Sequence, residues 1–419
     1  MYDWANSAYS TLSITVVNGY FLSVVFPEQP WGKTGPVAFA WAISGSMLLA
    51  GCASPVVGAW ADARAAKRHW LAATGLLGSA SALLMGLAPV EQPWLIVALF
   101  ALTSMFFELS LGFYNAFLPE LAGEEAMNRV SAWGFALGYI GGGIALAIAF
   151  GIVVFGDRLG LATRAEQLRA GILLMGAWWG ALSLPAIFLL RDRAPPRVLA
   201  PTLLGTAKHS FDEVWRTLRN VRALPSLALF LLGFLFYNDG VQTVLSQAST
   251  FATKELAFET GELFGLILMI QFVSFPGALA VGWVSDRLGQ RTALFGCLTV
   301  WSLLLIAAYF IDEKWQFWCL GAVVALVLGG VQSVSRAIMG RLTPPDRAAE
   351  FFGFFNLSGK TTSFMGTFLF GLVIGWTDDA RLAIVSLLAF ILLGFAIVAR
   401  VNFARGRNEA LAAVRKPPA

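Results

Sequence analysis

Gly58-Ala59-Trp60-Ala61-Asp62 and Gly282-Trp283-Val284-Ser285-Asp286 are two copies of one pattern, and this repeat decides the fold. Each copy ends an apolar segment, and the two align without a gap. The positive charges that follow are Arg64, Lys67 and Arg68 in the first copy and Arg287 and Arg291 in the second. Internal similarity between two hydrophobic halves is typical of membrane transporters. The sequence therefore predicts a chain built from two related halves.

The composition places the chain in a membrane. Hydrophobic residues make up 58% of its 419 residues, charged residues make up 13%, and the mean hydropathy is +0.71. About twelve apolar stretches are each long enough to cross the hydrocarbon core. They lack strict alternation, and backbone groups in lipid must be satisfied within each segment, so helices are favoured over barrel strands. We expect an all-α integral membrane protein of about twelve transmembrane helices, in two pseudo-symmetric halves of about six.

One long polar segment, from Arg191 to Leu224, divides the chain. We expect a first half over 1–190, a linker over 191–224, a second half over 225–403 and a cytoplasmic tail over 404–419. Within the linker, Ser210-Phe211-Asp212-Glu213 matches a capping box, and apolar residues recur at helical spacing after it. This pattern predicts an amphipathic helix on the inner membrane surface. A site for a regulatory partner is the alternative interpretation.

Positive charge is distributed unequally between alternate loops. The poorer set carries only Lys33, Arg158, Arg164, Arg169, Lys254, Lys314 and Arg381. Because positive loops mark the cytoplasmic side, both termini and the linker are predicted to be cytoplasmic, in an inner (plasma) membrane of bacterial type. The excess charge behind the pI of about 9.0 then faces anionic lipid headgroups, and we expect no nucleic-acid partner.

Enzyme and metal-binding classes are disfavoured. Cys52, Cys297 and Cys319 show no paired spacing, and His69 and His209 are isolated. These residues form no nucleophile or metal-ligand constellation, so we expect neither enzymatic activity nor a cofactor. The sequence contains no Gly-x-x-x-x-Gly-Lys-Ser/Thr loop, so direct use of ATP is not encoded. A monomeric secondary transporter of a small molecule is expected.

The repeat resembles the loops after helices two and eight of the major facilitator superfamily, which read Gly-x-x-x-Asp-Arg/Lys-x-Gly-Arg/Lys-Arg/Lys. The second copy fits well, whereas Ala63 and Ala65 replace the basic residue and second glycine of the first. A glycine lets helices approach, and an aspartate caps a helix or pairs with a base. We therefore expect Asp286→Ala to disturb transport more than Asp62→Ala. The predicted cytoplasmic gate residues are Gly58, Asp62, Arg64, Gly282, Asp286, Arg287 and Arg291.

Other stretches carry more specific resemblances. Gly134-x-x-x-Gly138-Tyr139-Ile140-Gly141-Gly142-Gly143 is similar to the glycine-rich motif of superfamily exporters, with Tyr139 in place of proline, although plain helix packing explains it equally. Four stretches resemble the vacuole-effluxer branch, an autophagy-related amino-acid permease-like family: Tyr2–Tyr9, Phe113–Glu120, Tyr237–Gln242 and Phe352–Lys360. This resemblance covers essentially the whole chain. It implies the major facilitator fold, a permease and, for vacuolar members, export of amino acids.

Charges within the predicted spans are the candidate site. An ionisable group in lipid costs several kcal/mol unless it faces water or a partner. In the superfamily the first, fourth, seventh and tenth helices line the central cavity, and four of the five charges fall on them. The charges are Asp3, Glu108, Asp239, Arg336 and Lys360. With their polar neighbours, the predicted substrate-binding or proton-coupling residues are Asp3, Asn6, Tyr9, Glu108, Tyr114, Asn115, Tyr237, Asn238, Asp239, Gln242, Gln332, Arg336, Asn356 and Lys360.

The balance of these charges suggests a mechanism. Three acids against two bases leave one carboxyl without an obvious cationic partner, and burial favours its protonated form, so Glu108 and Asp239 are candidate proton carriers. Alternatively, one of them pairs permanently with Arg336 or Lys360 as an interhelical clamp.

A cavity of mixed sign suits a zwitterion, whose carboxylate would meet Arg336 or Lys360 and whose ammonium would meet Asp239 or Glu108. We expect alternating-access export of a small polar or zwitterionic solute, an amino acid first. Export of drugs or other metabolites, and a non-transporting sensor on a transporter fold, remain alternatives.

Overall fold

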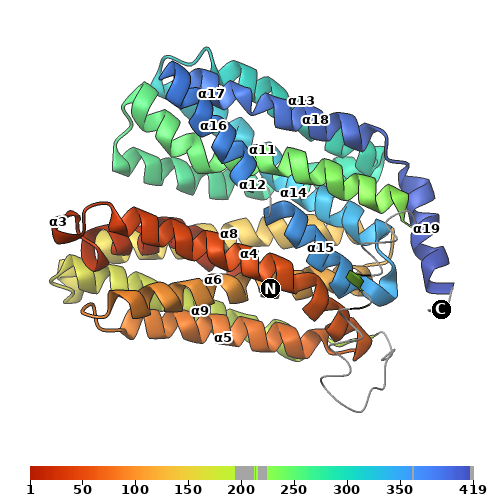
Figure 1. The fold of residues 1–419 in the computed structure, drawn as a ribbon, viewed down its shortest axis with the longest axis horizontal. Coiled ribbons are helices and arrows are strands. Elements are labelled where there is room, and N and C mark those ends of the chain that lie inside the picture. The colour runs from red at the N-terminus through yellow and green to blue at the C-terminus, as the bar shows by residue number, and fades with distance from the viewer. Residues whose placement is uncertain (194–211, 213, 216–223, 361–362, 416–419) are drawn as a thin grey trace.

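Helices make up every regular element of the computed structural model, which describes residues 1–193, 212, 214–215, 224–360 and 363–415. Figure 1 shows two bundles side by side. Helices before residue 190 form the lower bundle, called here the first half. Most helices from 225 to 399, called the second half, form the upper bundle, and the helix over 348–360 lies against the lower one. Of the predicted linker helix only Asp212, Val214 and Trp215 are described, so that prediction lies outside the described residues.

The first half consists mainly of long helices. A continuous helical segment over Tyr2–Val25 begins as α1 (Tyr2–Leu12), includes α2 (Asn18–Tyr20) and carries π-helical turns at Ser13–Val17 and Phe21–Val25. The other elements are α3 (Glu28–Trp31), α4 (Thr34–Ala63), α5 (Lys67–Leu87), α6 (Pro93–Ala116), α7 (Leu118–Leu121), α8 (Met127–Val154), a 3₁₀ turn (Gly156–Leu159) and α9 (Arg164–Leu189). Local signals explain several starts: Pro93 opens α6, and a Thr163–Glu166 capping box opens α9.

The second half repeats this plan. Its helices are α11 (Pro225–Leu256), α12 (Thr260–Leu288), α13 (Gln290–Ala308), α14 (Lys314–Leu342), α15 (Ala348–Lys360), α16 (Ser363–Thr377), α17 (Ala380–Ser386) and α18 (Leu388–Ala399), with a 3₁₀ turn at Pro345–Arg347. The predicted tail contains a further helix, α19 (Phe403–Arg415). Its apolar side packs on the start of α11 and the end of α14, where a side chain at Gly406 would meet Leu342 and Ser226.

In the described part of the chain, 11 segments are long and apolar enough to cross a membrane. The remaining expected span, near 351–376, corresponds to α15 and α16, which the structure describes on either side of residues 361–362. The all-helical membrane fold predicted from the sequence is therefore confirmed.

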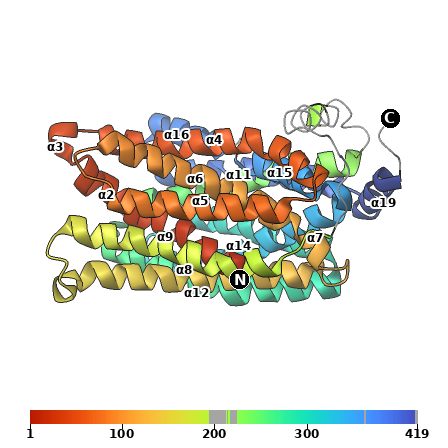
Figure 2. The same cartoon turned by 90° about the horizontal axis from the view of Figure 1, so that it is seen from below.

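The two ends of the molecule differ, and we name them for use below. The linker end, at the right of Figures 1 and 2, holds the ends of α4 and α12 and the helix α19; the α3 end is opposite. Both Gly-x-x-x-Asp copies lie at the linker end, as the repeat requires. Ala65 and Gly289 occupy equivalent positions, and both have left-handed backbone, with φ of 51° and 88°.

The strained position of Ala65 gives a stability prediction. Alanine pays a steric cost at positive φ that glycine does not, so Ala65→Gly is expected to raise the free energy of unfolding by about 1 kcal/mol. Thermal unfolding in detergent measures the effect. The matched substitution Gly289→Ala should lower stability by a similar amount; a loss of stability in Ala65→Gly would contradict this interpretation.

The seam between the halves is closed along one edge and open along part of the other. On the α8–α12 edge, Gly142 and Gly143 contact Gln271 and Phe272 midway along both helices. The rings of Phe150 and Phe264 lie 5.3 Å apart near the α3 end.

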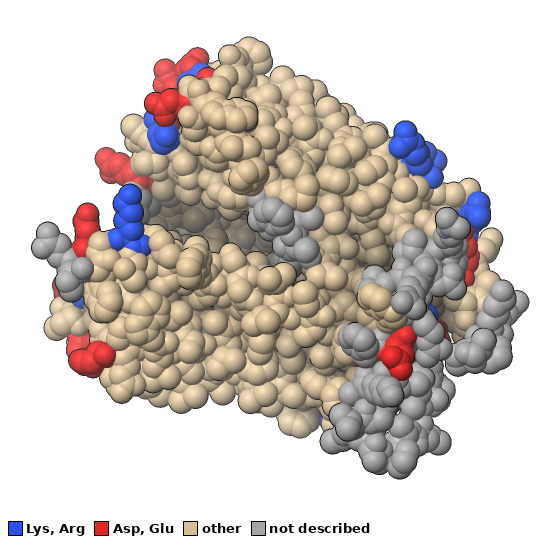
Figure 3. All heavy atoms as spheres, viewed as in Figure 1, with Lys and Arg blue, Asp and Glu red and all other residues tan. Residues whose placement is uncertain are grey.

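On the α4–α15 edge, contacts gather towards the linker end. There Gly58 contacts Ala349, Gly353 contacts Ser54, and Gly51 contacts Leu357. Figure 3 shows the surface on this side hollowed between the halves at the α3 end. This conformation is therefore closed at the linker end and open towards the α3 end.

Candidate functional site

Arg336 of α14 reaches across the seam and is held by the first half. It lies 3.3 Å from an Asp3 carboxylate oxygen on α1 and donates from Nη1 to the Asn115 side chain on α6 at 3.2 Å. It also donates to the Ser131 hydroxyl and carbonyl on α8, at 3.0 and 2.8 Å. Asp3 and Arg336 are 7% and 4% exposed, so both charges are buried. A buried ion pair holds only where further hydrogen bonds satisfy both ions, and these contacts supply them.

The surroundings of the ion pair explain the glycine-rich face of α8. A side chain at Gly134 would overlap both Asp3 and Arg336, so the absence of one makes room for the pair. The guanidinium also lies 4.2 Å from the Phe135 ring centre, and the Tyr114 hydroxyl donates to Asp3 at 2.7 Å. Sequence reasoning missed Ser131 and Phe135; their place on the Gly134–Gly138 face of one helix is the signal that identifies them.

A neutral hydrogen bond crosses the seam next to the ion pair. The Tyr139 hydroxyl donates to Gln332 at 2.7 Å, and Gln332 lies one helical turn from Arg336 towards the α3 end. Both residues are half-buried. Towards the linker end the pair is instead covered by an apolar cluster of Leu118, Ala122, Met127 and Ala337. The ion pair thus has a polar layer towards the α3 end and an apolar layer towards the linker end.

Asp239 occupies a different place, inside the second half. It is 0% exposed, and one carboxylate oxygen accepts from the backbone N–H of Gly366 in the first turns of α16 at 2.8 Å. Its other oxygen and the neighbouring Thr243 hydroxyl have no hydrogen-bond partner among the described residues. The adjacent Asn238 donates to the Gly359 carbonyl near the end of α15 at 3.1 Å. Asp239 and Asn238 thus bind α16 and α15, the described helices of the expected eleventh span.

The remaining predicted site residues are dispersed. Asn356 donates to the Glu108 carbonyl at 3.3 Å, which joins α15 to α6 across the seam. Tyr9 is packed in the first half, bonded to Ser104 at 2.6 Å, and Tyr237 is packed in the second half against Ser335 at 2.7 Å. Asn6 is buried on α1 and Gln242 is half-buried on α11. Lys360 ends α15, and its side chain is not among those described.

Asp3, Tyr114, Asn115 and Arg336 are therefore the predicted residues that the structure brings together. The clamp hypothesis gave Arg336 a partner in Glu108 or Asp239. The structure instead pairs Arg336 with Asp3, and it keeps Asp239 in the second half beside α16. Among the described residues, the assigned partners of the Arg336 side chain all belong to the first half.

The first predicted gate lies at the linker end and is deeply buried. Asp62, 4% exposed, accepts from the backbone N–H of Glu350 at the start of α15 at 2.9 Å, so it joins the halves. Lys67 lies 4.0 Å from Asp62, pairs closely with Glu120 and lies over the Phe117 ring.

Asp192 holds the start of α5 beside this gate. It accepts from the backbone N–H groups of Lys67 and Arg68 at 2.9 and 3.2 Å. Burial raises the pKa of Asp192, and these N–H groups partly offset the shift.

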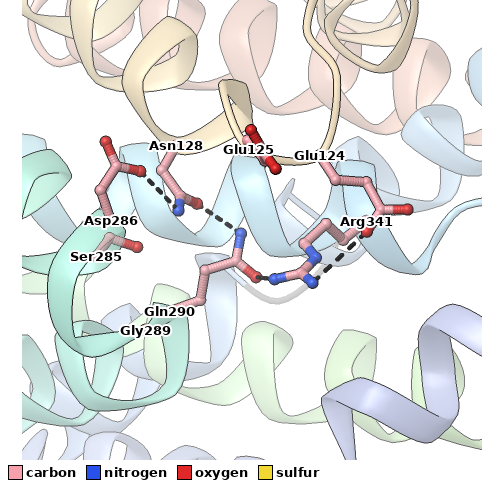
Figure 4. A pocket seen from close by; sticks show the side chains of 8 residues that line it. All are labelled: Glu124, Glu125, Asn128, Ser285, Asp286, Gly289, Gln290 and Arg341. Atoms are coloured by element: carbon pink, nitrogen blue, oxygen red, sulfur yellow. Dashed lines mark hydrogen bonds and ion pairs between the residues drawn. The ribbon is translucent and has the colours of Figure 1, made fainter.

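The second predicted gate is more exposed. Figure 4 shows it beside a cavity of about 350 Å³ at the linker end. Asn128 of α8 donates to Asp286 at 3.1 Å and accepts from Gln290 at 2.6 Å, which connects the halves through side chains alone. Arg407 of α19 also crosses the seam, to Glu124 at 2.7 Å.

The structure reverses the ranking of the two gates that motif quality predicts. Asp62 is buried and binds backbone, whereas Asp286 is exposed and binds a side-chain amide that has a second partner. Leaving a buried polar group without a hydrogen-bond partner costs more free energy than leaving an exposed one without a partner. We therefore expect Asp62→Ala to reduce the transport rate severalfold more than Asp286→Ala. Side-by-side flux measurements in proteoliposomes compare them, and a larger effect of Asp286→Ala would restore the ranking from the motif.

Comparison with known proteins places this site in context. Residues 37–411 match the family model described as "Vacuole effluxer Atg22 like". The chain is 30% identical over 410 residues to the uncharacterized MFS-type transporter YxiO of Bacillus subtilis, covering 96% of this chain and 93% of YxiO. It is 28% identical over 311 residues to autophagy-related protein 22-1 of Aspergillus fumigatus, covering 69% of this chain and only 50% of that protein.

A solved structure supports the fold. The major facilitator superfamily transporter FucP, in its outward conformation, superposes with a TM-score of 0.72 at 12% identity. The match covers 96% of this chain and 98% of FucP. The chain therefore shares the fold of this major facilitator superfamily transporter.

Proposed function

The chain belongs to the vacuole effluxer Atg22-like family of the major facilitator superfamily, and from this premise we propose that it exports a small zwitterionic solute, an amino acid first, in exchange for protons. The observation that carries this proposal is the Asp3–Arg336 pair at the seam. Opposite charges buried between two halves, below an opening at one end, suit a solute of mixed charge that crosses by alternating access.

The direction of the proposal depends on the loop charges. The linker end carries most of the Lys and Arg residues in loops, so we take it to be the cytoplasmic end of a plasma-membrane protein. The described conformation is then open to the outside, and export requires the halves to rock until the linker end opens. The match to YxiO covers nearly the whole of both chains, whereas the match to the Aspergillus fumigatus protein covers 69% of this chain and half of that protein.

Asp239 is the proposed proton carrier. A buried carboxylate with one oxygen that has no hydrogen-bond partner in the described part of the chain is costly as an anion, and protonation removes that cost. Its bond to the Gly366 N–H connects its charge state to the position of α16 in the second half. The adjacent Asn238 binds α15, which contacts α4 of the first half, so a proton bound at Asp239 has a route to the seam through α15 without touching Arg336.

The test is flux of an amino-acid panel into or out of proteoliposomes with and without an imposed pH gradient. We expect gradient-driven flux to fall by at least about tenfold in Asp239→Asn, whereas exchange at equal pH on both sides persists, because the solute site is intact. Asp157→Asn, which removes an exposed carboxylate at the α3 end, is the matched control and should behave as wild type.

Two outcomes would count against the proposal. A wild-type gradient-driven rate in Asp239→Asn would remove this residue from proton coupling. Flux of other metabolites without flux of any amino acid would leave a transporter but reject the proposed solute class.

A further inference from the structure

The Arg336 guanidinium is positioned by neutral groups independently of Asp3. Ser131 takes two of its N–H donors, at 3.0 and 2.8 Å, and Asn115 accepts from Nη1 at 3.2 Å. The Asp3 oxygens lie farther away, at 3.3 and 3.5 Å from Nη1. Strong charge-assisted bonds between these groups are usually near 2.7–2.9 Å, so the carboxylate is the loosest member of the set.

A second donor faces the same carboxylate. The Tyr114 hydroxyl donates to Asp3 at 2.7 Å, so Arg336 Nη1 and Tyr114 together present two donors from opposite halves to one carboxylate. Gly134 keeps the space around this carboxylate clear of side-chain atoms. Arginine with a hydroxyl at this spacing is a general carboxylate-binding arrangement, and here an internal carboxylate fills it.

We propose that Arg336 and Tyr114 form a carboxylate cradle, that Asp3 fills this cradle while the linker end is closed, and that the carboxylate of the transported solute competes with Asp3 for it. This inference rests on the proposed function and deepens it: the solute carries a carboxylate, and its binding is the step that releases the contact between the halves. When the solute replaces Asp3, the ionic bond between the halves is lost, and Arg336 stays joined to the first half only by its neutral hydrogen bonds to Ser131 and Asn115, so the linker end opens more readily.

The layers around the cradle determine the side from which a solute reaches it. Towards the α3 end it is bordered by the neutral bond between Tyr139 and Gln332, and both residues are half-buried. The linker side is covered by the apolar cluster around Met127 and Leu118. In the described conformation, a solute carboxylate therefore reaches the cradle more easily from the opening towards the α3 end.

Conformation without any solute is the first test. In a background lacking Cys52, Cys297 and Cys319, spin labels replace Leu121 and Leu288, which are exposed at the linker end in different halves. Asp3→Asn should shift the label distances towards a longer, open population, and the conservative variant Asp3→Glu should restore the short one. Unchanged distances in Asp3→Asn would overturn the releasing step. Asp157→Asn is the control and should give wild-type distances.

Binding of simple probes is the second test. Acetate supplies a carboxylate alone, and methylammonium supplies a cation alone. Removing the internal competitor should make acetate bind Asp3→Asn about tenfold more tightly than wild type, with no change for methylammonium. Tyr114→Phe keeps the ion pair but removes one donor of the cradle, so it should weaken acetate binding. This variant tests the cradle if Asp3→Asn does not fold.

Equal acetate affinity in wild type and Asp3→Asn would overturn the cradle even if amino-acid flux is observed. Tighter acetate binding and an open linker end in Asp3→Asn would support it even if the proton-coupled flux proposed above fails. The two proposals are thus separately testable.

Discussion

Arg336→Met is expected to abolish transport and to lower the free energy of unfolding by about 3–5 kcal/mol, because it leaves the buried Asp3 carboxylate without its cation. Methionine keeps much of the volume of arginine, so the loss is mainly electrostatic. Flux in proteoliposomes and thermal unfolding in detergent measure the two effects. Arg158→Met removes an exposed arginine at the α3 end and should change neither quantity appreciably.

A double variant distinguishes the effect of the ion pair on transport from its effect on folding stability. Asp3→Asn combined with Arg336→Met removes both charges, so it should recover much of the stability lost in Arg336→Met alone. Transport should stay absent, because the cradle for the solute is gone. If the double variant is as unstable as the sum of the single variants, the two charges do not interact and the assignment of the pair is wrong.

Gly58→Ala is expected to disfavour closure of the linker end. A side-chain carbon at Gly58 would lie 2.6 and 2.9 Å from the Ala349 carbonyl carbon and Glu350 nitrogen, which are backbone atoms of α15 and cannot rotate away. Overpacking of this kind costs about 2–3 kcal/mol. This cost lowers the closed population about 30- to 150-fold relative to the open one, and transport falls with it.

A neighbouring glycine of α4 supplies the control for this prediction. No other atom lies within 4 Å of a side chain placed at Gly45, so Gly45→Ala should transport and unfold like wild type. Label distances across the linker end report closure directly. Normal closure in Gly58→Ala would show that α4 and α15 accommodate the added carbon, and it would contradict this prediction.

Much of the fold could be predicted because its signals are local. Apolar length predicts the spans, and the paired Gly-x-x-x-Asp stretches predict the two halves and their common end. The way the eleventh span is held to α11 was not predictable from composition, since the stretch near 351–376 is largely apolar. Asp239 and Asn238 bind backbone groups of α16 and α15, and they lie more than a hundred positions earlier in the chain.

The candidate site was predicted as a set of residues but not as a set of pairs. Burial cost identifies Asp3 and Arg336 individually, because each is an ionisable residue in an apolar segment. Their contact joins positions 333 apart in the sequence, and nothing local favours Asp3 over Glu108 as the partner. Ser131 has no charge to mark it. Its role is visible only when the glycine face of α8 is seen to point at Arg336.

The unequal edges of the seam have a consequence for how this molecule opens. Contacts along α8 and α12 run from Gly282 near the linker end to Phe264 near the α3 end, whereas those between α4 and α15 gather near the linker end. The contact between α8 and α12 therefore acts as a hinge along one edge of the seam. In this state the halves separate on the α4–α15 edge only, so a solute enters asymmetrically although the fold is nearly symmetric.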